Sequence, residues 1–129
     1  MEELTIGEVA RRAKLNTSTI RYYERIGLLP RSKRVNKHRR FDAGVLPWLA
    51  LIHFAQQAGF TLAEIAVLFH GFEPDTPPAA RWKVLVERKL PEIDALIVRA
   101  QGMKRMLEQG LRCGCMSLED CGIALSSGC

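Results

Sequence analysis

The sequence predicts a mainly α-helical protein in which a winged helix-turn-helix domain precedes a long dimerisation helix and a short cysteine-rich tail. Two short helical patterns lie close together near the N-terminus, one long apolar repeat covers residues 79–111, and all four cysteines lie within residues 112–129. A chain of 129 residues with 47% apolar side chains can bury one compact core and carry an extended helix. It has no apolar run of 18 residues and no basic-then-apolar leader, so we expect a cytoplasmic protein with no membrane partner.

The first short helix is predicted over residues 4–13 (LTIGEVARRA), where Ile6, Val9 and Ala10 share one face. Only residues 14–16 separate it from the next helical pattern. Two short helices joined this tightly are typical of a helix-turn-helix, whose second helix enters the major groove of DNA. Such pairs also fill ordinary helical cores, so the pattern alone leaves both interpretations open.

The second helix is predicted within residues 17–29 (TSTIRYYERIGLL). Thr17 or Ser18 can cap its start, and Gly27 ends it. Tyr23 continues the apolar face and is expected in the core. The polar face carries side chains suited to a DNA groove and its phosphates: Arg21, Tyr22 and Arg25.

The N-terminal part of the chain is strongly basic. Residues 1–40 hold 11 Lys or Arg against 4 Asp or Glu, a net charge of +7, whereas the remainder carries −2. This is the electrostatic footprint of a protein that binds a polyanion, with a merely solvated basic face as the alternative. Residues 30–41 lack helical periodicity and predict a two-stranded wing that turns at Asn36 and Lys37.

A second helix pair is predicted over residues 43–69. Thr61 followed by Glu64 is the spacing of a capping box, which fixes the start of its second helix. His53 and His70 are expected at the surface or at the edge of the core rather than on a metal.

A linker rich in proline, residues 73–78 (EPDTPP), precedes a long amphipathic helix over residues 79–111. Its apolar repeat runs in steps of four and three, interrupted by Lys104 alone: Val86, Leu90, Ile93, Ile97, Ala100, Leu107 and Leu111. One helix cannot bury this stripe, so we expect it to pair with a second copy. Pro91 predicts a kink or a break. Two shorter helices packed within one subunit are the competing arrangement.

The tail over residues 112–129 holds the four cysteines: Cys113, Cys115, Cys121 and Cys129. Thiols clustered in a cytosolic protein favour metal binding or redox chemistry over structural disulfides. Cys113 and Cys121 enclose seven residues, a loop that can bring two thiolates onto one ion, and Cys115 can add a third. Thiolates select soft ions such as Cu(I), or the iron of iron–sulfur clusters.

The run TIGEVARRAKLNTSTIRYYERIGLLPRSKRVNKHRRFD resembles the DNA-binding end of the MerR family of bacterial transcription regulators. The resemblance continues over nearly the whole chain. It implies a winged DNA-binding domain at 1–72 with its wing at about 30–41, a linker at 73–78, a dimerisation helix at 79–111 in an antiparallel coiled coil, and an effector-sensing tail at 112–129. The family usually has glycine and tyrosine where this chain has Lys37 and His38, so we expect a different turn or a loose wing.

The resemblance also implies a homodimer on a palindromic element of double-stranded promoter DNA, with RNA polymerase at the same promoter. The ligand-bound dimer would distort the DNA, in a response to stress. Resemblance and charge together give the candidate DNA-binding residues as Thr17, Ser18, Thr19, Arg21, Tyr22, Arg25, Arg31, Arg34, His38, Arg39 and Arg40.

Two branches of the family compete for the tail. Cys113 with Cys121 resembles the spacing of the sensors of monovalent copper-group ions. The iron–sulfur branch has the pattern C-x2-C-x-C-x5-C, whose last three positions match Cys113, Cys115 and Cys121, whereas Gly110 occupies the first. A [2Fe–2S] cluster would therefore need Cys129 or another fourth ligand.

Other classes of function have little support. The chain has no phosphate-binding glycine loop or HExxH helix and no evident Ser/His/Asp set, so we do not expect an enzyme. A thiol oxidoreductase usually shows Cys-x-x-Cys beside a βαβ pattern, which is missing here. A DNA-binding protein without sequence preference is the remaining alternative, and it would show no response to metal.

Overall fold

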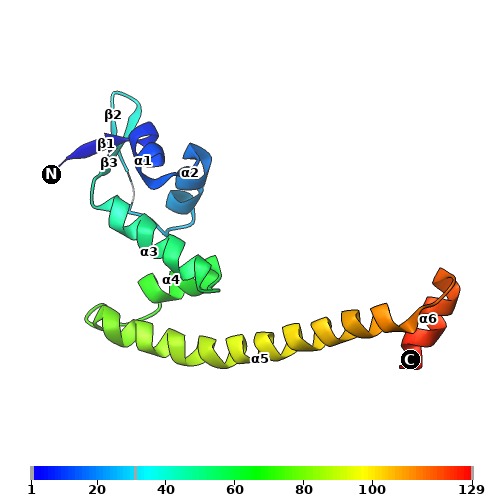
Figure 1. Ribbon diagram of the computed structural model, residues 1–129. Helices are drawn as coiled ribbons and strands as arrows, with labels where there is room; N and C mark the ends of the chain where they lie inside the picture. Colours follow the sequence, from blue (N-terminus) through cyan, green and yellow to red (C-terminus); the bar gives the residue numbers. More distant parts are fainter. Residues whose placement is uncertain (1, 31, 129) are drawn as a thin grey trace. The chain divides into compact units, whose positions relative to one another are not determined.

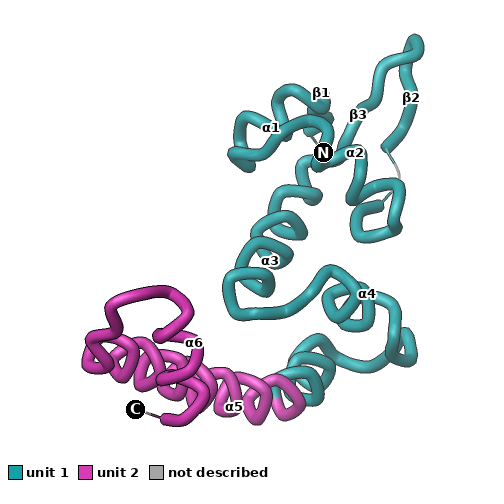
Figure 2. Tube along the Cα trace, turned by 90° about the vertical axis from the view of Figure 1, so that its right-hand side faces the viewer, with its two compact units in different colours: residues 1–86 teal, residues 87–129 magenta. Residues whose placement is uncertain are grey.

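The computed structural model describes residues 2–30 and 32–128. The chain divides into two compact units, residues 1–86 and 87–129 (Figure 2). The domain boundaries expected from the sequence, at 1–72, 73–78, 79–111 and 112–129, stay a prediction. Two predicted site residues, Arg31 and Cys129, lie outside the described residues. Among the residues that are described, no helix combines the length and apolar character of a membrane span.

Figure 1 shows the mainly helical architecture that the sequence predicts. The elements of the first unit are β1 (Glu3–Thr5), α1 (Ile6–Ala13), α2 (Thr17–Arg25), β2 (Lys33–Val35), β3 (His38–Asp42), α3 (Val45–Gln57), α4 (Leu62–His70) and the first turns of α5 (Pro78–Cys113). The second unit contains the rest of α5 and a short helix, α6 (Leu118–Ser126). The predicted winged helix-turn-helix and long helix are confirmed.

The wing belongs to an antiparallel sheet with strand order β1-β3-β2 in the described residues. The predicted two-stranded wing is confirmed as β2 and β3. The predicted start of the first helix at Leu4 was wrong, because Leu4 pairs with Phe41 in a strand. Thr5 explains the difference: its hydroxyl accepts from the Glu8 amide at 3.2 Å, and the Glu8 carboxylate accepts from the Thr5 amide at 3.2 Å. This capping box starts α1 at Ile6 and leaves the preceding residues extended.

One apolar core joins the sheet to the helices of the first unit. Leu4, Ile20, Leu28, Ile52 and Ile65 are each at most 1% exposed. Burial of one such side chain contributes about 1.5–3 kcal/mol relative to leaving it in water. The helix α2 contributes Ile20 and Tyr23 to this core, so the polar face of α2 is held in a defined place.

The start of α2 differs from the prediction. Asn16 is the N-cap residue and makes no side-chain capping bond, so capping by Thr17 or Ser18 was wrong. The Asn16 carbonyl instead accepts from the Thr19 amide at 3.1 Å and from the Ile20 amide at 3.3 Å. Both Thr17 and Ser18 lie inside the first turn of α2. Helix α1 ends at Ala13, three residues before Asn16, and the connecting segment places the cap at Asn16.

The wing turns at the predicted dipeptide and keeps the backbone that glycine would favour. Asn36 has φ 50° and Lys37 has φ 67°, both in the left-handed region. The expected change of turn was wrong, because β2 and β3 pair up to Val35 and His38 and leave room for a two-residue turn only. Lys37 therefore holds a conformation that costs an L-residue about 1–2 kcal/mol.

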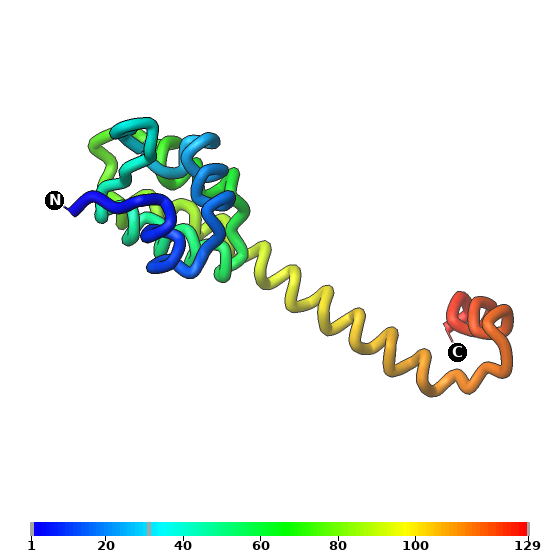
Figure 3. The backbone as a smooth tube through the Cα atoms, turned by 90° about the horizontal axis from the view of Figure 1, so that it is seen from above, coloured from blue at the N-terminus to red at the C-terminus, as the bar shows by residue number. Residues whose placement is uncertain are grey.

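The long helix is continuous from Pro78 to Cys113, and Figure 3 follows it as an uninterrupted coil. Of the kink or break predicted at Pro91, the break was wrong. Proline removes one backbone hydrogen bond, and the bonds on either side of it maintain the helix. Helix α6 was not predicted from the sequence; the Ser117 side chain caps it by accepting from the Asp120 amide at 3.1 Å.

Candidate nucleic-acid interface and cysteine tail

The second helix of the helix-turn-helix, α2, has one buried face and one polar face. Ile20 and Tyr23 are buried, as predicted, and the Tyr23 hydroxyl donates to Oε1 of Gln56 at 3.3 Å. Burial raises the pKa of Tyr23 above its usual 10.0, and the bond to Gln56 acts in the opposite sense. The phenol thus anchors α2 to α3 in its neutral form.

The polar face of α2 and the wing enclose one shallow groove. The groove is lined by Ser18, Arg21, Tyr22, Glu24, Arg25, Gly27, Leu29, Ser32, Arg34 and Arg39. Six predicted DNA-binding residues therefore meet in one place, although they come from the helix and from both wing strands. Side chains of this kind, arginines with a tyrosine and a serine, suit a phosphate backbone and base edges.

Glu24 lies among these cations and joins the helix to the wing. Its Oε2 accepts from the Ser32 amide at 3.1 Å, and its Oε1 lies 3.5 Å from Nε of Arg39. The Glu24 side chain is only 14% exposed, and that of Arg39 is 27% exposed. The Nε group of Arg39 is buried and makes no hydrogen bond within the described residues, so its nearby carboxylate supplies the balancing charge. The role of Glu24 could not be predicted from the sequence, since spacing alone does not reveal its partners.

The other predicted DNA-binding residues lie around this groove without lining it. His38 is exposed on β3 next to the turn, and Arg40 is half-buried on the same strand. Thr17 and Thr19 are half-buried in the first turn of α2. Within the groove, the guanidinium of Arg25 stacks over the Tyr22 ring at 5.2 Å from its centroid, which orients both side chains.

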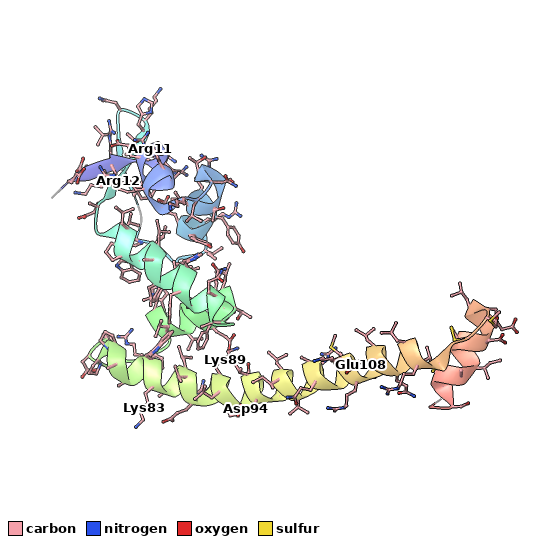
Figure 4. All side chains as sticks on the ribbon, in the orientation of Figure 1. Arg11, Arg12, Lys83, Lys89, Asp94 and Glu108 are labelled. Atoms are coloured by element: carbon pink, nitrogen blue, oxygen red, sulfur yellow. A yellow bond between two sulfur atoms is a disulfide. The ribbon has the colours of Figure 1, made fainter. Side chains whose placement is uncertain are left out.

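The tail brings two cysteines together. Cys115 and Cys121 form a disulfide with a Cα–Cα distance of 5.3 Å, and its yellow bond is visible in Figure 4. Cys113 is likewise disulfide-bonded. The sequence favoured Cys113 as the neighbour of Cys121, whereas the structure places Cys115 there. Within the described part of the chain, no group of three His, Cys, Asp or Glu side chains is arranged to hold a metal ion.

Comparison with known proteins identifies the family. The model of MerR HTH family regulatory proteins matches residues 4–71, and the model described as MerR, DNA binding, matches residues 46–110. The chain belongs to the MerR family. It is therefore a DNA-binding transcription regulator of the helix-turn-helix class, and the resemblance seen in the sequence is confirmed.

Relatives within the MerR family cover most of the chain. It is 30% identical over 124 residues to the HTH-type transcriptional activator SoxR homolog of Chromobacterium violaceum, covering 94% of this chain and 84% of that protein. It is 34% identical over 103 residues to the mercuric resistance operon regulatory protein of Bacillus cereus, covering 79% of this chain and 78% of that protein. The crystal structure of the transcription regulator PbrR691 from Ralstonia metallidurans, in complex with lead(II), superposes with a TM-score of 0.76 and 28% identity, covering 96% and 98% of the two chains.

Proposed function

We propose that this regulator binds a palindromic promoter element as a homodimer and distorts the DNA when its C-terminal cysteines bind a soft metal ion. The observation that carries the proposal is the meeting of Cys115 and Cys121 in the tail, with Cα atoms 5.3 Å apart. Once reduced, this pair presents two thiolates to one ion, and Cys113 precedes it by two residues. Thiolate ligands select soft metals.

DNA binding through α2 and the wing is supported by the groove described above. Arg21, Arg25 and Arg34 line it from two elements, so one DNA backbone can meet all three cations. We assign Arg39 to positioning rather than to phosphate contact, because Glu24 already balances its charge. The net charge of +7 over residues 1–40 favours the same surface for a polyanion.

A homodimer is supported by the apolar side chains that α5 leaves in solvent. Ile97 is 51% exposed, Leu107 is 73% exposed and Leu111 is 87% exposed. These residues belong to the repeat that the sequence predicts as a dimerisation stripe. A second copy of the same helix, running antiparallel, would cover both stripes and place two α2 helices on a palindrome.

The choice of metal follows from the donor set. Two thiolates suit an ion that accepts linear sulfur coordination, such as Cu(I). Two of the relatives are consistent with soft ions, since one is named for mercuric resistance and another was solved with lead(II). A [2Fe–2S] cluster is the alternative on the same cysteines, and it needs four ligands; one of the relatives is named as a SoxR homolog.

A soft ion would be held by the thiolates of Cys115 and Cys121, and a monovalent ion would offset one of their two negative charges. The chain's own contribution is a difference in affinity: the dimer that distorts DNA must hold the ion better than the relaxed dimer does. Distortion of a short DNA site costs about 1–6 kcal/mol, which a difference of about fivefold to 10⁴-fold in metal affinity between the two states can offset. Such distortion would then alter how RNA polymerase engages the promoter.

The experiment uses an operator selected by the protein from a random-sequence DNA pool. Protein reduced and purified without oxygen is titrated with Cu(I), and DNA bending is followed by fluorescence energy transfer between labelled DNA ends. We expect one ion per tail, a palindromic operator and increased bending on metal addition. Cys115→Ser and Cys121→Ser should lose the metal and the response while keeping operator affinity. Normal responses in both variants would overturn the assignment of the sensor.

A thiol switch is the second candidate, and the Cys115–Cys121 disulfide itself favours it. Its reduction takes two electrons and two protons, supplied by a dithiol reductant, and yields two thiols. If oxidation with glutathione disulfide changes bending of the selected operator while Cu(I) does not, the redox function replaces the metal function. Cys115→Ser would abolish either response, so only the choice of probe separates the two.

A further inference from the structure

His70, the last residue of α4, contacts the end of α2. Its Nε2 atom lies 2.7 Å from the carbonyl oxygen of Gly27. Because a carbonyl can only accept, Nε2 carries the proton and donates. Gly27 directly follows the C-cap of α2 and has φ 83°, so this bond holds the left-handed turn that terminates α2. The same turn is closed by the Leu28 amide, which donates to the Tyr23 carbonyl at 2.9 Å.

Arg81, in the first turn of α5, contacts the same end of α4 from another direction. Its Nη1 donates to the carbonyls of Leu68 at 3.3 Å and Phe69 at 3.1 Å. The remaining nitrogens donate to carbonyls of the linker: Nε to Thr76 at 2.9 Å, and Nη2 to Glu73 and Pro74 at 3.3 Å each. A guanidinium placed at the negative end of a helix also interacts favourably with the helix dipole.

The two contacts are separated by one peptide bond, because the Phe69 carbonyl and the His70 amide belong to the same peptide group. The last turn of α4 offers little freedom between them. Leu68 is buried, and the Gly71 amide donates to the Val67 carbonyl at 2.7 Å. A Cβ atom at Gly71 would meet that carbonyl at 2.8 Å, so the turn is closely packed. A shift of Arg81 must therefore move the backbone that carries the His70 ring.

We infer that Arg81 and His70 form a latch, in which α4 transmits the position of the first turn of α5 to the C-terminal end of α2. His70 is then a positioning residue for α2, and Arg81 is the residue that ties α2 to the dimerisation helix. The inference rests on the proposal that α2 meets the operator. It adds a route by which a change in the dimer can reach the DNA-binding surface.

The first test needs neither metal nor DNA. Amide hydrogen exchange of Leu28 reports the turn that His70 holds, and we expect faster exchange in His70→Ala. His70→Gln offers an N–H at similar reach and should restore the wild-type rate. His53→Ala, which removes an exposed imidazole from α3, is the matched control and should leave Leu28 unchanged.

Arg81→Lys decides whether the latch transmits. Lysine keeps the charge but cannot serve five carbonyls in the planar geometry of arginine. We expect faster exchange at Leu28, 53 residues away in sequence, as well as near residues 68–76. Faster exchange confined to 68–76 would overturn the latch, because α4 would then absorb the change.

The second test measures affinity for the selected operator in the metal-free protein. One hydrogen bond at an exposed site supports a loss of about threefold to tenfold for His70→Ala. The double variant with Arg81→Lys should lose less than the product of the two single effects, since both break one latch. If the double variant loses the full product of the two single effects, the latch is overturned. Arg21→Ala distinguishes failure of the latch from failure of the proposed function. If this variant binds the operator with normal affinity, α2 does not contact the operator, and the hydrogen-exchange experiment still tests the latch.

Discussion

Oε1 of Glu24 lies 3.5 Å from Nε of Arg39, and this ion pair joins α2 to β3, the central strand of the sheet. The same carboxylate accepts from the Ser32 amide at 3.1 Å, so one acidic side chain contacts both the residue that precedes β2 and the strand β3. A carboxylate beside DNA repels phosphate, and its presence in the groove needs a compensating role. Positioning of the wing supplies that role.

Replacing Glu24 with glutamine distinguishes charge repulsion from positioning of the wing, because the two effects change operator affinity in opposite directions. Electrostatics alone predicts tighter DNA binding, because one negative charge is removed from the interface. Positioning predicts weaker operator binding, by about threefold to tenfold, since a charged hydrogen bond is lost. We expect weaker binding in fluorescence anisotropy. Glu3→Gln removes an exposed acid and serves as the control, which should bind as tightly as wild type or more tightly.

Arg39 and Arg34 are expected to differ in the salt dependence of operator binding. Each phosphate contact adds about 0.9 to the slope of log affinity against log salt. Arg34→Ala should lower the slope by that amount, because Arg34 is exposed beside the groove. Arg39→Ala should weaken binding and leave the slope unchanged. Equal losses of slope would make Arg39 a phosphate contact.

Lys37→Gly is expected to stabilise the wing. Lys37 has φ 67°, a conformation that glycine adopts without the cost borne by a side chain with Cβ. We expect the free energy of unfolding of Lys37→Gly to exceed that of Lys37→Ala by about 1 kcal/mol. Both variants lose the same cation, so urea denaturation of the pair isolates the backbone effect. Equal stabilities would mean that the turn relaxes when lysine is removed.

Stability should fall above pH 10 in a way that depends on Tyr23. Burial raises the pKa of Tyr23 above 10.0, so the folded state holds the phenolic proton more tightly than the unfolded state does. The free energy of unfolding therefore decreases as pH rises above about 10, where the unfolded chain releases this proton first. Tyr23→Phe lacks the proton, and the wild-type advantage over it should shrink as pH rises above about 10. A constant difference would contradict the assignment.

Pro91→Ala is expected to stabilise α5. The helix is continuous across Pro91, so alanine can restore the missing backbone bond without rearrangement. The gain should be up to about 3 kcal/mol in the free energy of unfolding. Ala95→Pro, one turn later, is the converse control and should lose a comparable amount. If Pro91→Ala destabilises the chain, the proline ring contributes packing that alanine cannot replace.

Local signals in the sequence predicted most of the helices. Thr61 and Glu64 show the spacing of a capping box, and the structure confirms both bonds, at 3.1 and 2.9 Å. The same spacing exists at Thr5 and Glu8, yet the apolar Leu4 suggested that the helix began earlier. A strand that pairs with a distant segment leaves no local mark, because its partner decides its conformation.

The residue types of the candidate site were predictable from the sequence, whereas the contacts between them were not. Cations at 21, 25 and 34 meet in the groove as their charge suggested. The roles of Glu24, His70 and Arg81 depend on contacts between elements far apart in sequence, which no periodicity reveals. In the tail, spacing favoured Cys113 beside Cys121, whereas the turn before α6 brings Cys115 there.

The pairing of Leu4 with Phe41 also sets an order of events during synthesis of the chain. The two strands are 37 residues apart, so β1 cannot find its partner until β3 has left the ribosome. Helices α1 and α2, of eight and nine residues, are too short to be stable alone in water, and closing a loop of this length is slow and entropically costly. The helix pair and the sheet are therefore completed together, when the first strand is captured.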